Sequence, residues 1–199
     1  MLIIVWAIVS YIVGSIPFGL IVAYLVKRID IRKFGSGNIG ATNVVRVVGK
    51  KWGILTFFLD FIKGFFPVFI ANIIVPHYSY LFYIFIATLS VVGHNWSVFL
   101  RFKGGKGVST SIGAVLGLCL VYPKLIFPLI SAVLVWIGIF MLFRIVSLAS
   151  LLGAFVFLII SLIFLESPFT MLSVVLFVFI VIRHKKNISN LLQNKELPF

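Results

Sequence analysis

The stretch LIFPLISAVLVWIGIFMLFRIVSLASLLGAFVFLIISLIFL, Leu125–Leu165, consists of two uncharged apolar runs on either side of Arg144. A transmembrane helix needs about 20 consecutive, mainly apolar residues, and each run is of that length. The rest of the chain has the same character: 62% of its 199 residues are hydrophobic and 11% are charged, with a mean hydropathy of +1.26. Soluble domains carry about 25% charged residues, so this composition excludes a soluble or disordered chain and indicates a membrane protein.

Seven uncharged or nearly uncharged segments predict an all-α integral membrane protein, a polytopic bundle of seven transmembrane helices in one membrane-embedded domain, 1–199. The segments are 2–26, 52–75, 77–100, 108–122, 125–143, 145–165 and 168–182. The fourth and seventh are short for a bilayer, and five spans result if the fourth and fifth form one bent or re-entrant unit. The first run has no preceding cations and ends in Lys27-Arg28, which predicts a retained anchor rather than a cleaved signal peptide.

The basic residues predict the orientation of this bundle. Of the 17 Lys and Arg, 15 lie in alternate connections and the C-terminal tail, whereas Lys124 lies on the other side and Lys63 within a span. Because cytoplasmic loops carry an excess of cations, we expect the N-terminus outside and the C-terminus in the cytoplasm. The net charge of +13 does not indicate nucleic acid, because aromatic and basic residues are not interleaved on a polar surface. Two explanations of the excess of basic residues remain: they set the membrane topology, and they bind anionic substrates or lipid headgroups.

The first long polar stretch contains Gly-Ser-Gly-Asn-Ile-Gly-Ala-Thr-Asn-Val-Val-Arg at 35–46. It matches the dinucleotide pattern G-x-G-x-x-G, but no strand–helix–strand context accompanies it. We expect glycine N–H groups to form an anion nest, neutral side chains to add donors and an arginine to bind phosphate. The residues concerned are Gly35, Gly37 and Gly40, then Ser36, Asn38, Thr42 and Asn43, and finally Arg46. A flexible loop that only sets topology is the alternative, but it needs no such density of Gly, Asn, Ser and Thr.

The second stretch contains Phe-Lys-Gly-Gly-Lys-Gly at 102–107, directly before the fourth predicted helix. The spacing is not that of a Walker A motif. It still combines glycines with a cation at a helix N-terminus, whose dipole favours an anion. We therefore expect Gly104, Gly105, Lys106 and Gly107 to contact phosphate. His94, slightly upstream, is interpreted mainly as an interfacial hydrogen-bonding residue.

The third stretch is Arg183-His184-Lys185-Lys186-Asn187-Ile188, after the last predicted span. A basic tail in this place commonly binds anionic lipid. His184 and Asn187, at i and i+3, share a helix face and can converge on one ligand, and His184 can also accept a proton. The short turn 144–150 adds the hydroxyl of Ser147.

Three features inside the predicted spans have mainly structural interpretations. Asp60 and Lys63, at i and i+3, can neutralise each other, and a pair that locks the helix is at least as plausible as a substrate role. Gly113-x-x-x-Gly117 predicts a helix-packing surface. Cys119 stands alone, which excludes a disulfide within the chain. No zinc-binding spacing occurs, and Cys119 is expected to be a small core residue.

Together these stretches resemble the bacterial acyl-phosphate-dependent glycerol-3-phosphate acyltransferase family, in order and along the whole chain, including 59–64 and 146–150. The resemblance implies transfer of an acyl group from acyl phosphate to glycerol 3-phosphate, giving 1-acylglycerol 3-phosphate (lysophosphatidic acid) and phosphate, the first acylation of phospholipid synthesis. It implies a seven-helix bundle in the bacterial inner membrane with its site at the cytoplasmic face. The partners implied are the two substrates and membrane lipids. Whether the enzyme that supplies acyl phosphate docks on this chain stays open.

The residues fit this reaction, because both substrates are phosphorylated and phosphate is a good leaving group that requires no metal, cofactor or covalent nucleophile. We expect Ser36, the 35–40 backbone and the Lys106 loop to hold phosphate, and Arg46, Lys106, Ser147 and Asn187 to hold glycerol 3-phosphate. The base is either His184 or the substrate's own phosphate. No H-x-x-x-x-D motif occurs, which excludes the acyl-CoA and acyl-carrier-protein enzymes as a model. A membrane carrier or channel for organic phosphates is the alternative function, and a lipid-binding scaffold is a third possibility.

Overall fold

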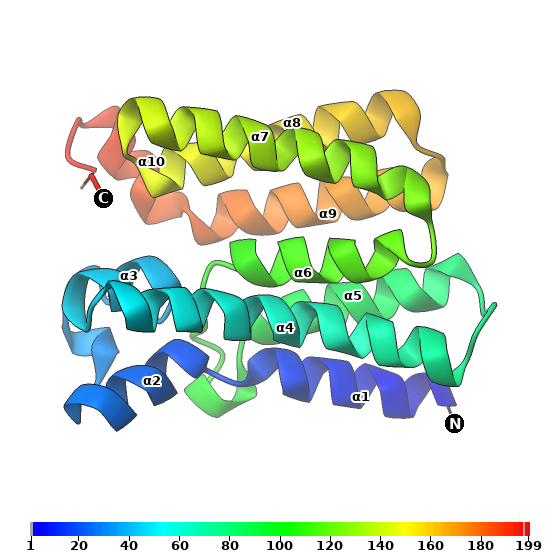
Figure 1. Ribbon diagram of the computed structural model, residues 1–199, viewed down its shortest axis with the longest axis horizontal. Coiled ribbons are helices and arrows are strands. Elements are labelled where there is room, and N and C mark those ends of the chain that lie inside the picture. The colour runs from blue at the N-terminus through cyan, green and yellow to red at the C-terminus, as the bar shows by residue number, and fades with distance from the viewer. Residues whose placement is uncertain (1, 197) are drawn as a thin grey trace.

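The computed structural model describes residues 2–196 and 198–199, and the regular structure of these residues is entirely helical (Figure 1), as predicted. Ten α-helices and three short 3-10 turns occur within this part of the chain. The elements are α1 (Leu2–Ser15), α2 (Phe18–Lys27), η1 (Ile31–Lys33), α3 (Ala41–Val47), α4 (Lys50–Ile74), α5 (Tyr80–Asn95), η2 (Val98–Leu100), α6 (Val108–Cys119), η3 (Pro123–Leu125), α7 (Ile126–Phe143), α8 (Val146–Phe164), α9 (Ser167–Arg183) and α10 (Lys185–Leu192).

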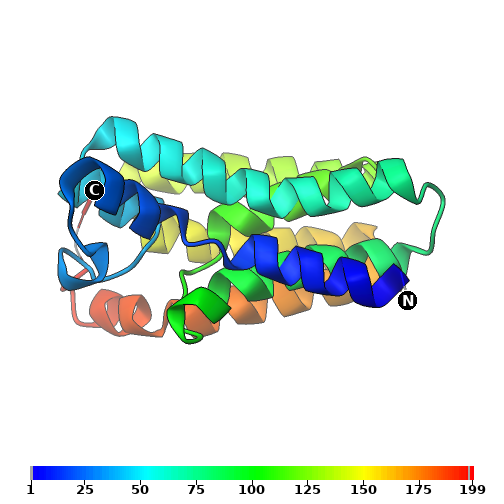
Figure 2. The ribbon, with the colours of Figure 1, turned by 90° about the horizontal axis from the view of Figure 1, so that it is seen from below.

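The long helices lie side by side along the long axis of the molecule, and the described ends of the chain lie at opposite ends of the bundle (Figure 1). The principal helix pairs are α4 with α6, α7 with α8, and α1 with α5. Turned by 90°, the bundle shows α4 and α9 along opposite edges (Figure 2). The short helices α2, α3 and α10 gather at the same end as the C-terminus (Figure 1). We call this the basic end, because the Lys- and Arg-rich segments 27–51 and 183–195 lie there.

Length and composition identify membrane spans among these helices. Five helical segments of the described residues are long and apolar enough to cross a bilayer, and a sixth results if α9 and α10, which meet at a bend of 64°, are one span. The five are Leu2–Lys27, Lys50–Ile74, Tyr80–Leu100, Pro123–Phe143 and Val146–Phe164. Each of the seven predicted segments contains a helix, but α6 has only 12 residues, about 18 Å of helix. The class of integral membrane, all-helical protein is therefore established. By length and composition the described helices give five or six spans, so the seven predicted spans stay a prediction.

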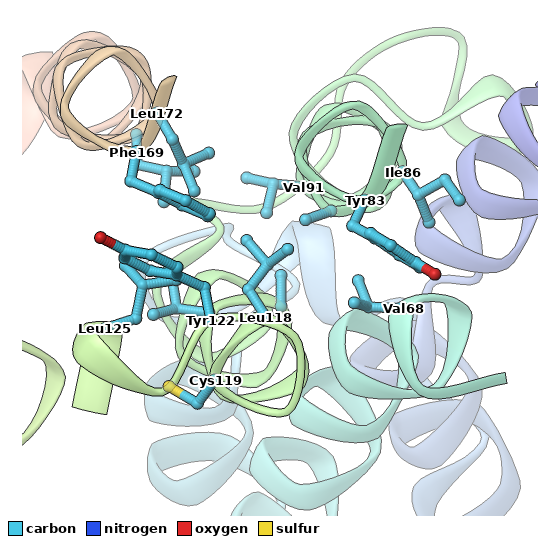
Figure 3. Packing of buried hydrophobic residues seen from close by; sticks show 14 of the residues in the cluster. Val68, Tyr83, Ile86, Val91, Leu118, Cys119, Tyr122, Leu125, Phe169 and Leu172 are labelled. Carbon is cyan, nitrogen blue, oxygen red and sulfur yellow. The ribbon is translucent and has the colours of Figure 1, made fainter. Parts of the chain in front are cut away.

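The main hydrophobic core lies in the half of the bundle away from the basic end, where α5 and α9 begin (Figure 1), and Figure 3 shows part of it. There the rings of Tyr122 and Phe169 stack with centroids 4.0 Å apart, and Leu118, Leu125 and Leu172 surround them. Cys119 is buried in the same cluster, which confirms its interpretation as a core residue. This packed region closes the space between the helices.

Close helix contact depends on glycines, as in many membrane proteins. A Cβ on Gly113 of α6 would collide with the backbone carbonyl of Phe61 in α4, and one on Gly64 would collide with that of Thr110. Gly117 faces Val68 in the same way, its Cβ position lying 3.0 Å from the Val68 Cβ. The predicted Gly113-x-x-x-Gly117 packing surface is thus confirmed.

The first span is broken between α1 and α2 at Ile16-Pro17. Proline has no N–H to continue a helix, so carbonyl groups of the preceding turn lose their partners. Lys63 donates to the Ile16 carbonyl at 2.7 Å, and Ser97 donates to the Ser15 carbonyl at 2.6 Å. Lys63 also pairs with Asp60 at 2.8 Å. The intramembrane ion pair therefore locks the break in the first span to α4.

Candidate active site

A cavity of about 670 Å³ lies between α3, α4, α6, α7, α8, α9 and α10. Its two ends differ in chemistry. Toward the basic end it is lined by polar side chains: Ser36, Asn38, Thr42, Arg46, Lys106, Ser147, His184, Asn187 and Glu196. Toward the packed core it is lined by apolar side chains, among them Val115, Leu129, Ala132, Val133, Trp136, Phe157, Leu176 and Ile180. A molecule with an anionic head and a hydrocarbon tail fits such a space.

The first glycine-rich loop is built around Asn43. Its Nδ2 donates to the carbonyls of Asn38 and Phe34 at 2.8 and 3.0 Å, and its Oδ1 accepts from the N–H of Ser36 at 2.9 Å. Gly35 has φ +57° and its Cβ position is blocked by the Asn43 side chain, so both residues are required by the shape of the loop. The amide of Asn43 is thus used within the loop, although the residue borders the cavity.

Two glycine N–H groups that were predicted to form an anion nest donate hydrogen bonds within the loop instead. The N–H of Gly37 donates to the Phe34 carbonyl at 3.0 Å, and that of Gly40 donates to Asn38 Oδ1 at 2.8 Å. Ser36, Asn38, Gly40 and Thr42 border the cavity, whereas Gly35 and Gly37 are not among its lining residues. The loop therefore presents mainly side chains, together with Arg46 from α3.

The second glycine-rich loop is held against α5. The N–H of Gly104 donates to the Asn95 carbonyl at 3.2 Å, and that of Gly105 donates to the His94 carbonyl at 3.0 Å. Neither glycine is among the lining residues, whereas Lys106 and Gly107 are. The two glycines position Lys106 rather than face the cavity themselves.

Lys106 is the main cation of the polar end. Burial, together with the positive charges of Arg46 and Arg183, lowers the pKa of its ammonium to about 8 against the opposing charge of Glu196. A buried cation without a tight counter-ion attracts an anionic ligand strongly. The sequence prediction that Lys106 contacts phosphate agrees with this position.

His184 and Asn187 lie at the bend between α9 and α10, and both face the cavity. His184 is 2% exposed, and its Nδ1 lies 2.8 Å from the Ile180 carbonyl. A carbonyl only accepts, so Nδ1 carries the proton and Nε2 is left as an acceptor. Burial, together with the charge of Lys106, lowers the pKa of His184 to about 4. His184 is therefore neutral near pH 7 and is a weak base.

Sequence reasoning missed Glu196, which lies in the polar end of the cavity. Its Oε1 accepts from Ser147 Oγ at 2.7 Å and from Asn187 Nδ2 at 2.5 Å. Burial raises the pKa of this carboxyl, but these hydrogen bonds and the charge of Lys106 outweigh burial and hold it below its usual value. Arg46 donates to the Pro198 carbonyl at 3.0 Å. The sequence feature that could have indicated Glu196 is its position as an isolated acidic residue in a basic tail.

Asp60 and His94 form a second buried polar group at the cavity wall. His94 Nδ1 lies 3.6 Å from Asp60 Oδ1, and Lys63 Nζ lies 2.8 Å from the same oxygen. The distance from His94 is too long for a hydrogen bond, and within the described residues His94 Nδ1 has no hydrogen-bond partner, so the interpretation of His94 as a hydrogen-bonding residue stays a prediction. Within the described part of the chain, no three His, Cys, Asp or Glu side chains gather closely enough to hold a metal ion.

These features define a helical membrane protein with one cavity that is basic at one end and apolar at the other. Comparison with known proteins gives its family. Residues 4–194 match the family model described as glycerol-3-phosphate acyltransferase. The glycerol-3-phosphate acyltransferase of Aquifex aeolicus is 44% identical over 195 residues, covering 96% of this chain and 95% of that protein. The Wolbachia pipientis enzyme is 41% identical over 192 residues, 96% of each chain. The chain belongs to the glycerol-3-phosphate acyltransferase family.

Solved structures agree with this assignment. The crystal structure of PlsY, an integral membrane glycerol 3-phosphate acyltransferase, in its glycerol 3-phosphate form has a TM-score of 0.88 to this chain at 40% identity. The match covers 100% of this chain and 96% of that one. The lysophosphatidic acid form gives a TM-score of 0.86 at 39% identity, with the same coverage. The predicted family and the acyltransferase activity are thereby confirmed.

Proposed function

We propose that this chain transfers an acyl group from acyl phosphate to glycerol 3-phosphate. The observation that carries the proposal is the division of one cavity into a basic, hydroxyl-bearing end and an apolar end that reaches the packed core. The phosphorylated heads of both substrates belong at the first end, and the acyl chain belongs at the second. That PlsY is known in a glycerol 3-phosphate form and a lysophosphatidic acid form supports these two molecules as substrate and product.

Arg46 and Lys106 are the groups that hold glycerol 3-phosphate by its phosphate. The guanidinium of Arg46 offers a planar fork that suits phosphate oxygens, and Lys106 supplies a buried cation. Ser147 and Asn187 lie at the opposite wall, where their polar groups suit the glycerol hydroxyls. Ser36, together with Asn38, Gly40, Thr42 and Gly107, lines the part of the cavity that receives the phosphate of the donor.

Catalysis then rests on positioning and electrostatics. A glycerol hydroxyl oxygen attacks the acyl carbonyl carbon, an ester bond forms, and the carbon–oxygen bond to phosphate breaks as phosphate leaves with the bonding electrons. The hydroxyl proton needs an acceptor. In the free enzyme His184 has a pKa of about 4 and is a weak base, whereas a phosphate monoester keeps basic oxygens near neutral pH. We therefore assign the proton to the substrate's own phosphate, and His184 Nε2 orients the hydroxyl.

The proposal includes the membrane arrangement. α6 runs from within the bundle, after the Lys106 loop, toward the end away from the basic end, and the two described chain ends lie at opposite ends (Figure 1), as an odd number of crossings requires. We propose seven crossings, with the N-terminus outside and the basic end in the cytoplasm of a bacterium, where glycerol 3-phosphate is available. The chain then works as one domain in the inner membrane, and the enzyme that makes acyl phosphate supplies the donor from the cytoplasmic side.

Purified protein in lipid nanodiscs tests the proposal. Glycerol 3-phosphate is supplied with palmitoyl phosphate or palmitoyl-CoA, and release of phosphate is followed together with lysophosphatidic acid. Stoichiometric product from acyl phosphate alone is expected. Product only from palmitoyl-CoA would overturn the donor assignment, and counterflow of glycerol 3-phosphate in liposomes without any product would favour the carrier. Arg46→Ala and Lys106→Ala should each lower kcat/KM by about 10- to 150-fold, because each removes a charge-assisted contact.

A further inference from the structure

Arg183 has a role beyond membrane topology in this structure. Its Nε donates to the Gly105 carbonyl at 2.8 Å, and its Nη2 donates to the Gly104 carbonyl at 2.6 Å. Its guanidinium carbon also lies 5.8 Å from the ring centre of Trp96. A guanidinium is planar and carries its donors in a fixed fork, so this pair of bonds fixes both the distance and the orientation of the loop.

The glycine pair that Arg183 binds is held from two sides. On the α5 side, the N–H groups of Gly104 and Gly105 donate to the last turn of that helix. A Cβ on Gly104 would collide with the His94 carbonyl, and one on Gly105 would collide with the His94 imidazole. The side facing α9 is held by Arg183. The loop is therefore fixed between α5 and α9 by its backbone groups.

This fixed loop leads directly to Lys106, which faces the cavity. Arg183 also directly precedes His184, whose imidazole faces the same space. One side chain thus connects the segment that carries the phosphate-binding cation with the helix end that carries His184. The charge of Arg183 also disfavours the protonated forms of Lys106 and His184.

We propose that Arg183 is a positioning residue for the acyl transfer, one that holds Lys106 and His184 at a fixed separation by bridging the Gly104 and Gly105 carbonyls. The inference rests on the proposed function for its kinetic meaning, since Lys106 is taken to bind substrate phosphate. Arg183 itself is not among the residues that line the cavity. Its effect is exerted through the loop.

Two variants separate geometry from charge. Arg183→Lys keeps the charge but replaces the planar fork by a single ammonium, and Arg183→Gln removes the charge as well. A displacement of about 1 Å in a catalytic group lowers the rate by about 100-fold, so Arg183→Gln should lower kcat/KM for glycerol 3-phosphate by about 10- to 100-fold. Arg183→Lys should lie between it and the wild type. Lys186→Gln is the matched control, because it removes an exposed charge from the same tail, and it should leave kcat/KM unchanged.

The pH profile supplies a readout that a merely structural role does not move. The charged and titratable groups around Lys106 are Arg46, Arg183, His184 and Glu196 at the polar end, with Asp60 and His94 further along the wall. Loss of the Arg183 charge favours protonated Lys106, so the basic limb of kcat/KM should move to higher pH in Arg183→Gln. It should stay in place in Arg183→Lys. Since kcat/KM reports the free enzyme, bound substrate does not alter this comparison.

Binding of glycerol 3-phosphate, measured calorimetrically in nanodiscs without donor, separates this inference from the proposed function. Weaker binding by both variants than by wild type and Lys186→Gln supports the positioning role, even if the wild type fails to turn over acyl phosphate. Wild-type binding and kinetics in Arg183→Gln, or full recovery of both in Arg183→Lys, would overturn it. If Arg183→Gln does not fold, the Arg183→Lys comparison alone decides the matter, because that variant keeps the topological charge.

Discussion

The apolar end of the cavity sets a limit on acyl-chain length, and Ala154→Phe tests where that limit lies. On α8, Ser147 lies at the polar end, and Ala154 and Phe157 follow along the same lining. With a rise of about 1.5 Å per residue, Phe157 is about 15 Å beyond Ser147 and Ala154 about 10 Å. One leaflet of the hydrocarbon core, half of about 30 Å, is as deep as the longer of these distances. The cavity thus matches an ordinary membrane acyl chain.

A phenylalanine ring at position 154 should block the last third of this space. A palmitoyl chain then loses the burial of about four methylenes, at about 0.8 kcal/mol each, or about 3 kcal/mol in total. An eight-carbon chain ends before the block. The ratio of kcat/KM for palmitoyl phosphate to that for octanoyl phosphate should therefore fall by up to about 150-fold.

Phosphate release from the two donors, in nanodiscs of one lipid composition, measures this ratio. Leu152→Phe is the control, because Leu152 is 36% exposed on α8 and is not among the residues that line the cavity. It should leave the ratio unchanged. If Ala154→Phe lowers kcat/KM equally for both donors, or leaves both unchanged, the acyl chain does not lie along α8 and the placement is refuted.

Three further results are expected. Wild-type kcat/KM for glycerol 3-phosphate should fall above about pH 8, where Lys106 loses its proton, and a profile flat to pH 9.5 would contradict the role of this cation. Glu196→Gln should move that basic limb to lower pH, because the negative charge of Glu196 favours protonated Lys106, and a shift in the other direction would refute the contact. Asp60→Asn leaves the buried Lys63 without its counter-ion and should cost about 3–5 kcal/mol of stability. The double variant with Lys63→Met should recover only part of that loss in thermal unfolding, because it also lacks the bond from Lys63 to the Ile16 carbonyl. An Asp60→Asn variant as stable as the wild type would refute the ion-pair explanation.

The sequence sufficed for features that depend on local composition. Each apolar segment contains a helix, Cys119 lies in the core, and Asp60 pairs with Lys63 as their i, i+3 spacing suggests. The three polar stretches converge on one cavity, because all of them connect spans at the same end of the bundle. Patterns of hydrophobicity and charge along the chain predict such features without knowledge of which helices are neighbours.

Features that depend on packing were not readable in the same way. Arg183 was counted only as a charge of the basic tail, because its bonds to Gly105 and Gly104 span 78 and 79 positions of the chain. Glu196 reaches Ser147 across 49 positions. Asn43 looked like a ligand-binding amide, yet its hydrogen bonds shape the loop. In each case the same polar side chain can bind either a ligand or another part of the chain, and only the folded structure shows which of the two lies within reach.

The interruptions of the helices explain how the site is placed in a membrane protein. α1 ends at Ser15, α6 begins only at Val108 and α9 ends at Arg183, all toward the basic end (Figure 1). Non-helical backbone at membrane depth is tolerated only where protein or a water-filled cavity satisfies its polar groups. Lys63 satisfies the carbonyl at the first break, and Arg183 satisfies those of the loop before α6. The shortness of α6, which kept it out of the span count, therefore has a consequence for the site: the helix begins inside the bundle, and Lys106, just before it, reaches the cavity from there (Figure 1).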